Sequence, residues 1–429
     1  TASWGFKIDT GTSAEMRVSN AVKFIVDANS RISLSNNDNN SNNTVFGYTA
    51  FNAGSDNGSD YNTIIGHNSA GTGSVSGATY NVGLGYNSLT DLTSADYNVA
   101  LGSNAASNLT TGGSNVAIGQ GALSTPTTAA SNVVIGQEAM ADIQAGQAIT
   151  GCVAVGFEAI KGAGGTTTGI DGSVAVGNQA LKALTTGARN LAIGYQAADS
   201  LTVGDDNIAI GHNAFGSATT TDGIDANIAI GTYALDGTSG QVVSSVVAIG
   251  YAAMTGACED EVAGSVAIGR AALGAVTTGA GNVAIGYRAA EALTTGGQNV
   301  IIGYQAMDAS DGTEENNIAI GHSALGSLDE QGNAANGNIG IGTNSGLSGA
   351  VTGNHLDNIA IGRNALDATT SNGLTGTVAI GGLALSSLTS GTANLAIGYS
   401  AGASLTASSE NTVIGYEAFD AATTGMHNN

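Results

Sequence analysis

The stretch NVAIGYRAAEALTTGGQ, residues 282–298, decides the fold, because its opening phrase recurs along the chain. The phrase is N-h-A-h-G-x-x-A-h, where h is an apolar residue. It occurs 21 times from residue 43 onward, with its glycines 17 to 21 residues apart. A repeat this short has no core of its own, so it must bury its apolar residues against neighbouring copies. The sequence therefore predicts an all-β parallel solenoid of about 21 coils of 17–21 residues.

Composition supports a solenoid and excludes several other classes. The 429 residues include 66 glycines but only one proline, which excludes collagen and proline-rich disorder. The net charge is −23, and residues 1–46 are balanced, so the repeats carry all of it. A surface of this kind repels phosphate backbones, and we expect no nucleic-acid partner.

The acidic residues concentrate between repeats, as at Glu314 and Glu315. They are either solvated loops or ligands for divalent cations. Cys152 and Cys258 lie about five coils apart, roughly 24 Å at ~4.8 Å per coil, so we expect no disulfide. No leader and no apolar run of about 18 residues occurs, so we expect no membrane insertion by this segment.

Residues 1–42 differ from the repeats. Two β-forming stretches, 23–26 and 31–34, flank the turn residues 27–30, which predicts a hairpin. We interpret 1–42 as a small N-terminal β cap or connector that ends in an Asn/Ser-rich linker, and 43–429 as the solenoid rod. Asn428 stands 17 residues after Asn411, where another repeat should begin, so we expect the rod to be truncated at its C-terminal end.

The strand part of the repeat alternates. In residues 283–285 this predicts Val283 and Ile285 on the inner face and Ala284 on the outer face. A methyl-only outer face is unusual for a solvated strand. We expect the same face of a sister chain to cover it.

An asparagine stands four residues before the phrase glycine in 16 of 21 repeats. Stacked asparagines can hydrogen-bond along the rod and satisfy backbone groups of the turns. The predicted structural ladder comprises Asn43, Asn62, Asn81, Asn98, Asn115, Asn132, Asn190, Asn207, Asn227, Asn282, Asn299, Asn317, Asn338, Asn358, Asn394 and Asn411.

The phrase glycine is expected to supply a positive φ or a close backbone approach. The clearest examples are Gly47, Gly119, Gly194, Gly286, Gly303, Gly398 and Gly415. Three residues later comes Ala in most repeats, and the apolar residue after it is expected to anchor a second short strand.

Aromatic residues favour the position just after the phrase glycine. Because this position also accepts His, Gln, Arg and Thr, it indicates a surface ladder rather than a metal site. His67, His212 and His322 occupy it. As a partly exposed row it can contact sugars or partner surfaces; the candidate contact residues are Tyr195, Tyr251, Tyr287, Tyr304, Tyr399 and Tyr416.

Repeat lengths vary because extra residues follow the second apolar position, and such loops are the preferred contact regions. No phosphate loop, zinc spacing or nucleophile elbow occurs. Hexapeptide acyltransferases need strict six-residue spacing, which these gaps break. We therefore expect no catalytic, metal or cofactor-binding residue and no cofactor.

The phrase Asn-Val-Ala-Ile-Gly-x-x-Ala, at 115–122 and 282–289, resembles the head repeat of YadA-like trimeric autotransporter adhesins. The resemblance covers 43–429 and implies a left-handed parallel β-roll packed side by side as a homotrimer. Residues 24–38 resemble segments that precede such repeats in tail fibres of marine tailed bacteriophages. Together they imply a non-enzymatic phage tail-fibre shaft, located on the virion, that attaches to a host-surface glycan or protein.

Two alternatives stay open. One is the passenger head of a bacterial trimeric autotransporter adhesin, located at the cell surface and binding host or matrix surfaces. The other is a polysaccharide-degrading tailspike, which needs paired carboxylates in an aromatic groove, whereas Trp4, the sole tryptophan, lies outside the repeats. An ice-binding array is disfavoured because the Thr-Thr-Gly turns recur at unequal intervals.

Overall fold

The structure is a computed structural model of the full chain. It describes residues 4–9, 13–18, 21–27, 32–33, 42–51, 58–163, 166–217, 224–238, 243–259, 262–310, 312–326, 328, 335–346, 353–368, 373–421 and 423. The chain divides into unit 1, Thr1–Asn190, and unit 2, Leu191–Asn429.

The first strands of unit 1 form an antiparallel sheet in the order β1-β2-β3-β4. They are β1 (Trp4–Asp9), β2 (Ser13–Val18), β3 (Ala21–Asp27) and β4 (Ile32–Ser33). Strands β3 and β4 pair as the predicted hairpin, with Ile25 opposite Ser33. The predicted linker comprises residues 35–42, of which 35–41 lie outside the described residues.

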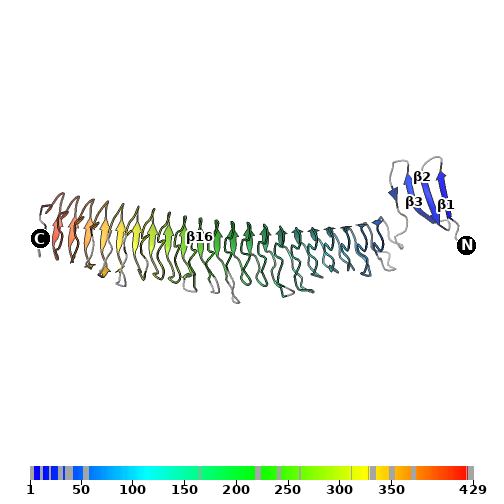
Figure 1. Ribbon diagram of the computed structural model, residues 1–429, viewed down its shortest axis with the longest axis horizontal. Coiled ribbons are helices and arrows are strands. Elements are labelled where there is room, and N and C mark those ends of the chain that lie inside the picture. The colour runs from blue at the N-terminus through cyan, green and yellow to red at the C-terminus, as the bar shows by residue number, and fades with distance from the viewer. Residues whose placement is uncertain are drawn as a thin grey trace. The chain divides into compact units, whose positions relative to one another are not determined.

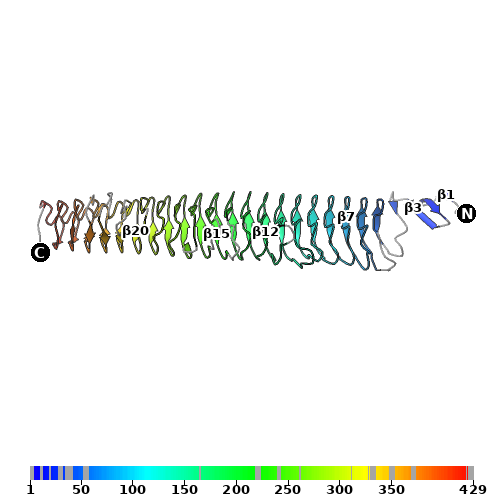
Figure 2. The same ribbon diagram turned by 60° about the horizontal axis from the view of Figure 1, so that its bottom comes forward.

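The repeats of unit 1 form a parallel β-solenoid, with one three-residue strand for each phrase (Figures 1 and 2). Each strand pairs in register with the strands of the adjacent coils, as in β8 and β9, where Ala100 lies opposite Ala117. The eight strands are β5 (Thr44–Phe46), β6 (Thr63–Ile65), β7 (Val82–Leu84), β8 (Val99–Leu101), β9 (Val116–Ile118), β10 (Val133–Ile135), β11 (Val153–Val155) and β12 (Val174–Val176).

Unit 2 continues the same pattern with thirteen strands in one parallel ladder. Equivalent residues again face each other, so Ala267 lies opposite Ala284. The strands are β13 (Leu191–Ile193), β14 (Ile208–Ile210), β15 (Ile228–Ile230), β16 (Val247–Ile249), β17 (Val266–Ile268), β18 (Val283–Ile285), β19 (Val300–Ile302), β20 (Ile318–Ile320), β22 (Ile339–Ile341), β24 (Ile359–Ile361), β26 (Val378–Ile380), β28 (Leu395–Ile397) and β29 (Thr412–Ile414).

A second, smaller parallel ladder lies just before the asparagine position. In unit 2 it comprises the two-residue strands β21 (Ala335–Asn336), β23 (His355–Leu356), β25 (Leu374–Thr375) and β27 (Gly391–Thr392). The prediction that the apolar residue after the repeat alanine anchors a strand is wrong. That residue adopts a left-handed turn, as Ala290 does with φ of 50°.

The predicted inside and outside of the strand are reversed. Ala284 is fully buried, whereas Val283 and Ile285 are only half-buried. The physical reason is the width of the coil. Ala289, Ala290 and Leu293 from the turn side already fill the interior, so the strand contributes only a methyl group inward and its branched residues point out.

The phrase glycine meets both expected requirements. Gly286 has φ of +144°, and a Cβ placed there would lie 2.1 Å from the carbonyl oxygen of Gly303 in the next coil. A residue with a side chain disfavours this backbone conformation, and its Cβ would not fit unless the backbone shifted. The turn then alternates, since Arg288 and Ala290 also have positive φ values of 55° and 50°.

Many of the inserted loops named as preferred contact regions lie outside the described residues, at 218–223, 239–242, 329–334, 347–352 and 369–372. The predicted start of a further repeat at 428 lies outside them as well. The candidate surfaces below lie on the parts of the coils that the structure describes.

Candidate functional site

The asparagine residues form hydrogen-bonded columns inside each unit. In unit 2 the Oδ1 of Asn299 accepts hydrogen bonds from the backbone N–H of Asn317 at 2.9 Å and from its Nδ2 at 3.2 Å. The Nδ2 of Asn299 donates to the carbonyl of Glu314 at 2.7 Å. The same three contacts recur at Asn98 and Asn115 in unit 1. The column thus satisfies buried backbone groups that the short strands leave unpaired.

Five repeats have another residue in place of asparagine, and four of these replacements form two consecutive pairs, whereas Thr377 stands alone and is followed by Asn394. Cys152 is followed in the next coil by Ser173, and Val246 is followed by Ser265. In both cases the backbone N–H of the serine turns to a carbonyl three residues earlier, at 3.2 Å. Cys152 and Val246 offer no Oδ1, so an asparagine in the next coil would leave its amide one acceptor short. Serine has no side-chain amide, so it does not need this additional acceptor.

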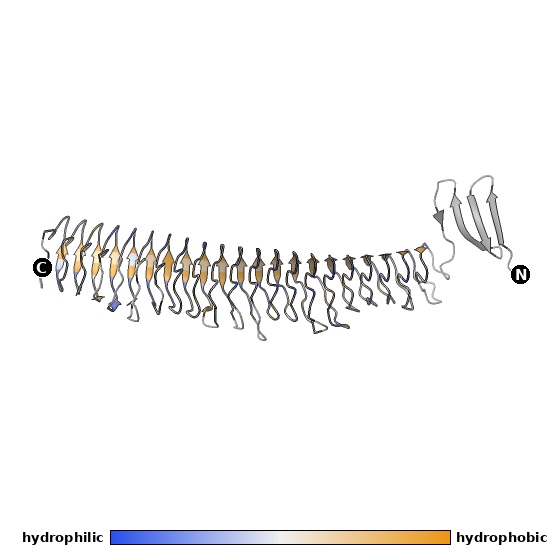
Figure 3. Cartoon of the chain, in the orientation of Figure 1, coloured by the Kyte–Doolittle hydropathy of each residue, from blue (hydrophilic) through white to orange (hydrophobic). Residues whose placement is uncertain are grey.

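The outward strand residues build an apolar face on the sheet of each unit, and the solenoid strands in Figure 3 are coloured mainly toward the hydrophobic end of the scale. It consists of two columns, the first and third residues of each strand, which are almost all Val, Ile or Leu. Members such as Val133, Ile193 and Ile302 are 36–39% exposed. Soluble monomers rarely expose a continuous apolar patch this long, and such patches mark interaction surfaces.

The predicted aromatic row stacks. In unit 2, Tyr287 and Tyr304 have ring centroids 5.0 Å apart, and His322 continues the stack at 5.2 Å. Tyr195 stacks on His212 and Tyr399 on Tyr416. Tyr251 does not contact another ring of the predicted set, because Arg270 lies between it and Tyr287.

A second aromatic stack, in unit 1, was not among the predicted contact residues. Tyr61, Tyr80 and Tyr97 precede the ladder asparagine, and their rings stack in parallel with centroids 4.9 and 5.0 Å apart. The recurring Tyr-Asn dipeptide was the available signal. All three rings are about half exposed, so they offer a flat apolar strip to a partner.

A cluster of charged residues in unit 1 is joined by ion pairs. Lys161 bridges Glu138 and Glu158 at 2.7 and 2.8 Å, and Lys182 contacts Glu158 at 2.7 Å. Burial acts to raise the pKa of Glu158, but hydrogen bonds from Lys161, Lys182 and Gln179 outweigh it and lower that pKa to about 2. The cluster therefore stays ionised and internally satisfied.

The two cysteines are buried inside the solenoid. Cys152 and Cys258 are both free and buried, and desolvation raises their pKa to about 11 and about 12. These thiols are poor nucleophiles at neutral pH. Within the described residues, no group of three or more His, Cys, Asp or Glu side chains can hold a metal ion. The described part of the chain also contains no helix able to cross a bilayer.

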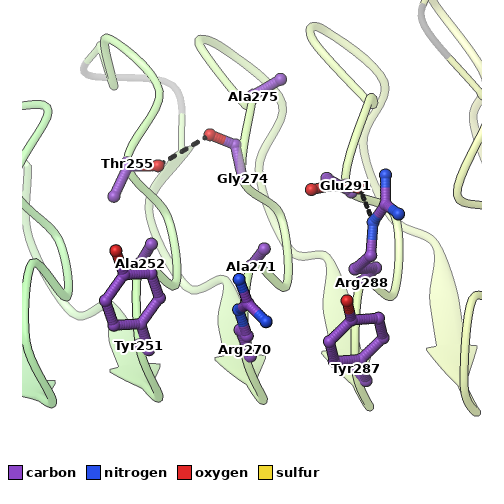
Figure 4. A pocket seen from close by; sticks show the side chains of 10 residues that line it. All are labelled: Tyr251, Ala252, Thr255, Arg270, Ala271, Gly274, Ala275, Tyr287, Arg288 and Glu291. Carbon is purple, nitrogen blue, oxygen red and sulfur yellow. Dashed lines mark hydrogen bonds and ion pairs between the residues drawn. The ribbon is translucent and has the colours of Figure 1, made fainter.

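A surface depression of unit 2 lies on the aromatic row (Figure 4). It has a volume of about 480 Å³ and brings together Tyr251, Arg270, Tyr287, Arg288 and Glu291. Two of the predicted contact residues, Tyr251 and Tyr287, therefore line this depression. The two arginines were not singled out in the sequence, although Arg at an aromatic position within an acidic chain was a usable signal.

Comparison with known proteins assigns no relative. No family model, no curated protein and no solved structure matches this chain significantly. Function is therefore argued from the surfaces described above.

Proposed function

We propose that the chain is the shaft of a homotrimeric, non-enzymatic fibre that attaches a virus particle to its host through repeated surface contacts. The observation that carries the proposal is the apolar face formed by the outward Val and Ile columns. A rod whose strands expose two such columns on coil after coil needs a cover. Identical chains supply one, because each presents the same columns at the same coil spacing.

The face that packs in this proposal is the Val/Ile face rather than the alanine face. The number of chains, three, and a left-handed roll come from the resemblance of the repeated phrase to YadA-like head repeats. The assignment to a phage tail fibre comes from the resemblance of residues 24–38 to segments that precede such repeats in phage tail fibres. Side-by-side packing leaves the aromatic row as a surface for host contacts, and weak contacts repeated over three chains give avidity.

Sedimentation equilibrium of the purified chain tests the assembly. The expected mass is three times the chain mass of 41.8 kDa. An Ile285→Asp variant places a carboxylate on the apolar face and is expected to shift the equilibrium toward monomer, because burying an unpaired charge is costly. Gln298→Asp, on an exposed turn of the same coil, is the matched control and should stay trimeric. A monomeric wild-type chain at micromolar concentration contradicts the assembly.

Adsorption tests the function. Fluorescently labelled wild-type protein is incubated with a panel of bacterial isolates, and bound fluorescence is measured after washing. We expect saturable binding to some isolates and no shortening of their capsule or lipopolysaccharide glycans. Absence of binding across the panel contradicts the attachment role, and glycan shortening identifies a depolymerase instead.

A further inference from the structure

The depression on unit 2 arises from small residues in two consecutive coils. The second residue after the phrase glycine is Ala252 and then Ala271, whereas the next coil has Arg288 there. Ala275 and Gly274 keep the adjoining turn equally low. These small residues and Thr255 leave the depression open between the two aromatic rings, and Tyr251 and Tyr287 stand at its ends (Figure 4). Its volume of about 480 Å³ falls in the range of small-ligand sites.

Arg270 lies in the middle of this depression. Its guanidinium carbon is 5.4 Å from the ring centroid of Tyr251 and 5.7 Å from that of Tyr287. The two rings hold the guanidinium by cation–π contacts on both sides. No acidic side chain pairs with Arg270 among the residues that the structure describes. A fixed, exposed and unpaired guanidinium is unusual in a chain with a net charge of −23.

The edge of the depression is neutral in sum. Arg288 donates from Nε to Oε2 of Glu291, so these two charges offset each other. The site consequently presents one free positive charge and two aromatic faces. Oε1 of Glu291 can also accept a hydrogen bond from a hydroxyl group. This set matches a small ligand that carries one negative charge and several hydroxyl groups.

We propose that this depression binds a single carboxylated sugar residue of an acidic glycan, with the carboxylate on Arg270. A guanidinium and a carboxylate form two parallel hydrogen bonds, and the C–H face of a sugar ring packs on an exposed tyrosine. The inference rests on the proposed attachment role, since it names the chemistry of the receptor at this surface.

A single carboxylate fits better than a phosphate polymer. Phosphate backbones need many cations, whereas only ten Lys and Arg residues occur in the whole chain and Arg288 is already paired. The overall negative charge is screened beyond about 8 Å at physiological salt, so it does not prevent a contact made directly at Arg270. The two rings of Tyr251 and Tyr287 also restrict the side chain of Arg270, which lies between them, before a ligand binds. This lowers the conformational entropy lost on binding.

The test titrates the full chain with acidic oligosaccharides and observes binding by saturation-transfer NMR. The probes are oligosaccharides of glucuronate, mannuronate and sialic acid, each beside its carboxyl-reduced counterpart. We expect at least one acidic probe to bind, and its reduced form and the Arg270→Gln variant to weaken binding by about tenfold or more. Arg363→Gln is the matched control, because Arg363 holds the same repeat position between Thr343 and Gly382. It should bind as the wild type does.

Three results overturn the inference: no acidic probe binds at millimolar concentration, the carboxyl-reduced probes bind equally well, or Arg270→Gln binds unchanged. A far-UV circular dichroism spectrum identical to that of the wild type shows that the variant is folded. The attachment role is judged separately by adsorption to cells. Cell binding without any binding of acidic probes refutes the inference and leaves that role standing. Binding of a probe through Arg270 without adsorption to cells supports the site and refutes the role.

Discussion

Removing one asparagine from the middle of a column should open the solenoid locally. In Asn299→Ala, the backbone N–H of Asn317 loses its acceptor at 2.9 Å, and Asn317 is fully buried. A buried N–H without an acceptor costs about 1–3 kcal/mol. The two lost hydrogen bonds donated by Nδ2 of Asn299, to Asn282 and to Glu314, contribute about 1 kcal/mol each.

The expected loss is therefore about 3–5 kcal/mol in the free energy of local opening. Hydrogen–deuterium exchange measured by mass spectrometry reads this directly, peptide by peptide. The amides of β19 and β20 should exchange about 100 to 5,000 times faster than in the wild type, since about 1.4 kcal/mol corresponds to a factor of ten. Exchange within twofold of the wild type in these strands would refute the ladder as a source of stability.

The natural interruption at Val246 and Ser265 provides the matched control. The double variant Asn299→Val with Asn317→Ser copies it and allows the N–H at 317 to turn to the carbonyl three residues back, as that of Ser265 does. Exchange in β19 and β20 should then be slower than in Asn299→Ala. Faster exchange in the double variant contradicts the explanation given for the paired substitutions.

Two further perturbations follow from the interior. His355 is buried with neither ring nitrogen hydrogen-bonded among the described residues, and desolvation lowers its pKa from 6.5 to about 4. As the pH falls, the unfolded chain therefore binds a proton at His355 before the folded chain does. The contribution of neutral, buried His355 to the free energy of unfolding, about 3 kcal/mol, is present above pH 6.5 and is lost as the pH falls through 4. Urea unfolding from pH 8 to 4 should show less acid sensitivity in His355→Leu, which places the residue found at Leu374 in the next coil; equal sensitivity contradicts this. Gly286→Ala should lower the melting temperature far more than Gly281→Ala. Both glycines have a positive φ that disfavours alanine, but an added Cβ meets the Gly303 carbonyl in the first case and only Cγ of Gln298, at 3.9 Å, in the second; equal shifts would show that the close approach relaxes freely.

The positions of the three-residue strands of the solenoid were predictable because each of them begins just after the asparagine position of the phrase. The glycine requirement was predictable too, since few other causes explain glycine at a constant register. Which strand face lies inside was not. Alternation establishes only that Ala284 points opposite to Val283 and Ile285. The width of the coil decides the rest, and it depends on how Ala289 and Leu293 pack from the other side.

Turn conformation was equally hidden. Arg288 and Ala290 carry positive φ values that their residue types disfavour, so residue type alone does not predict this turn. Stacking of successive coils imposes the turn. The Arg270 site needed knowledge of neighbours 17 to 19 residues away in the sequence, since Tyr251 and Tyr287 meet Arg270 only when coils are placed in register.

The strict register within each unit has a consequence for how such chains change over generations. Because alanine faces alanine and glycine faces glycine between adjacent strands, as at Ala284 and Gly286, duplication or deletion of one whole repeat recreates the same junction. Reach can then be adjusted in discrete increments by unequal recombination, with no new packing problem to solve at the seam.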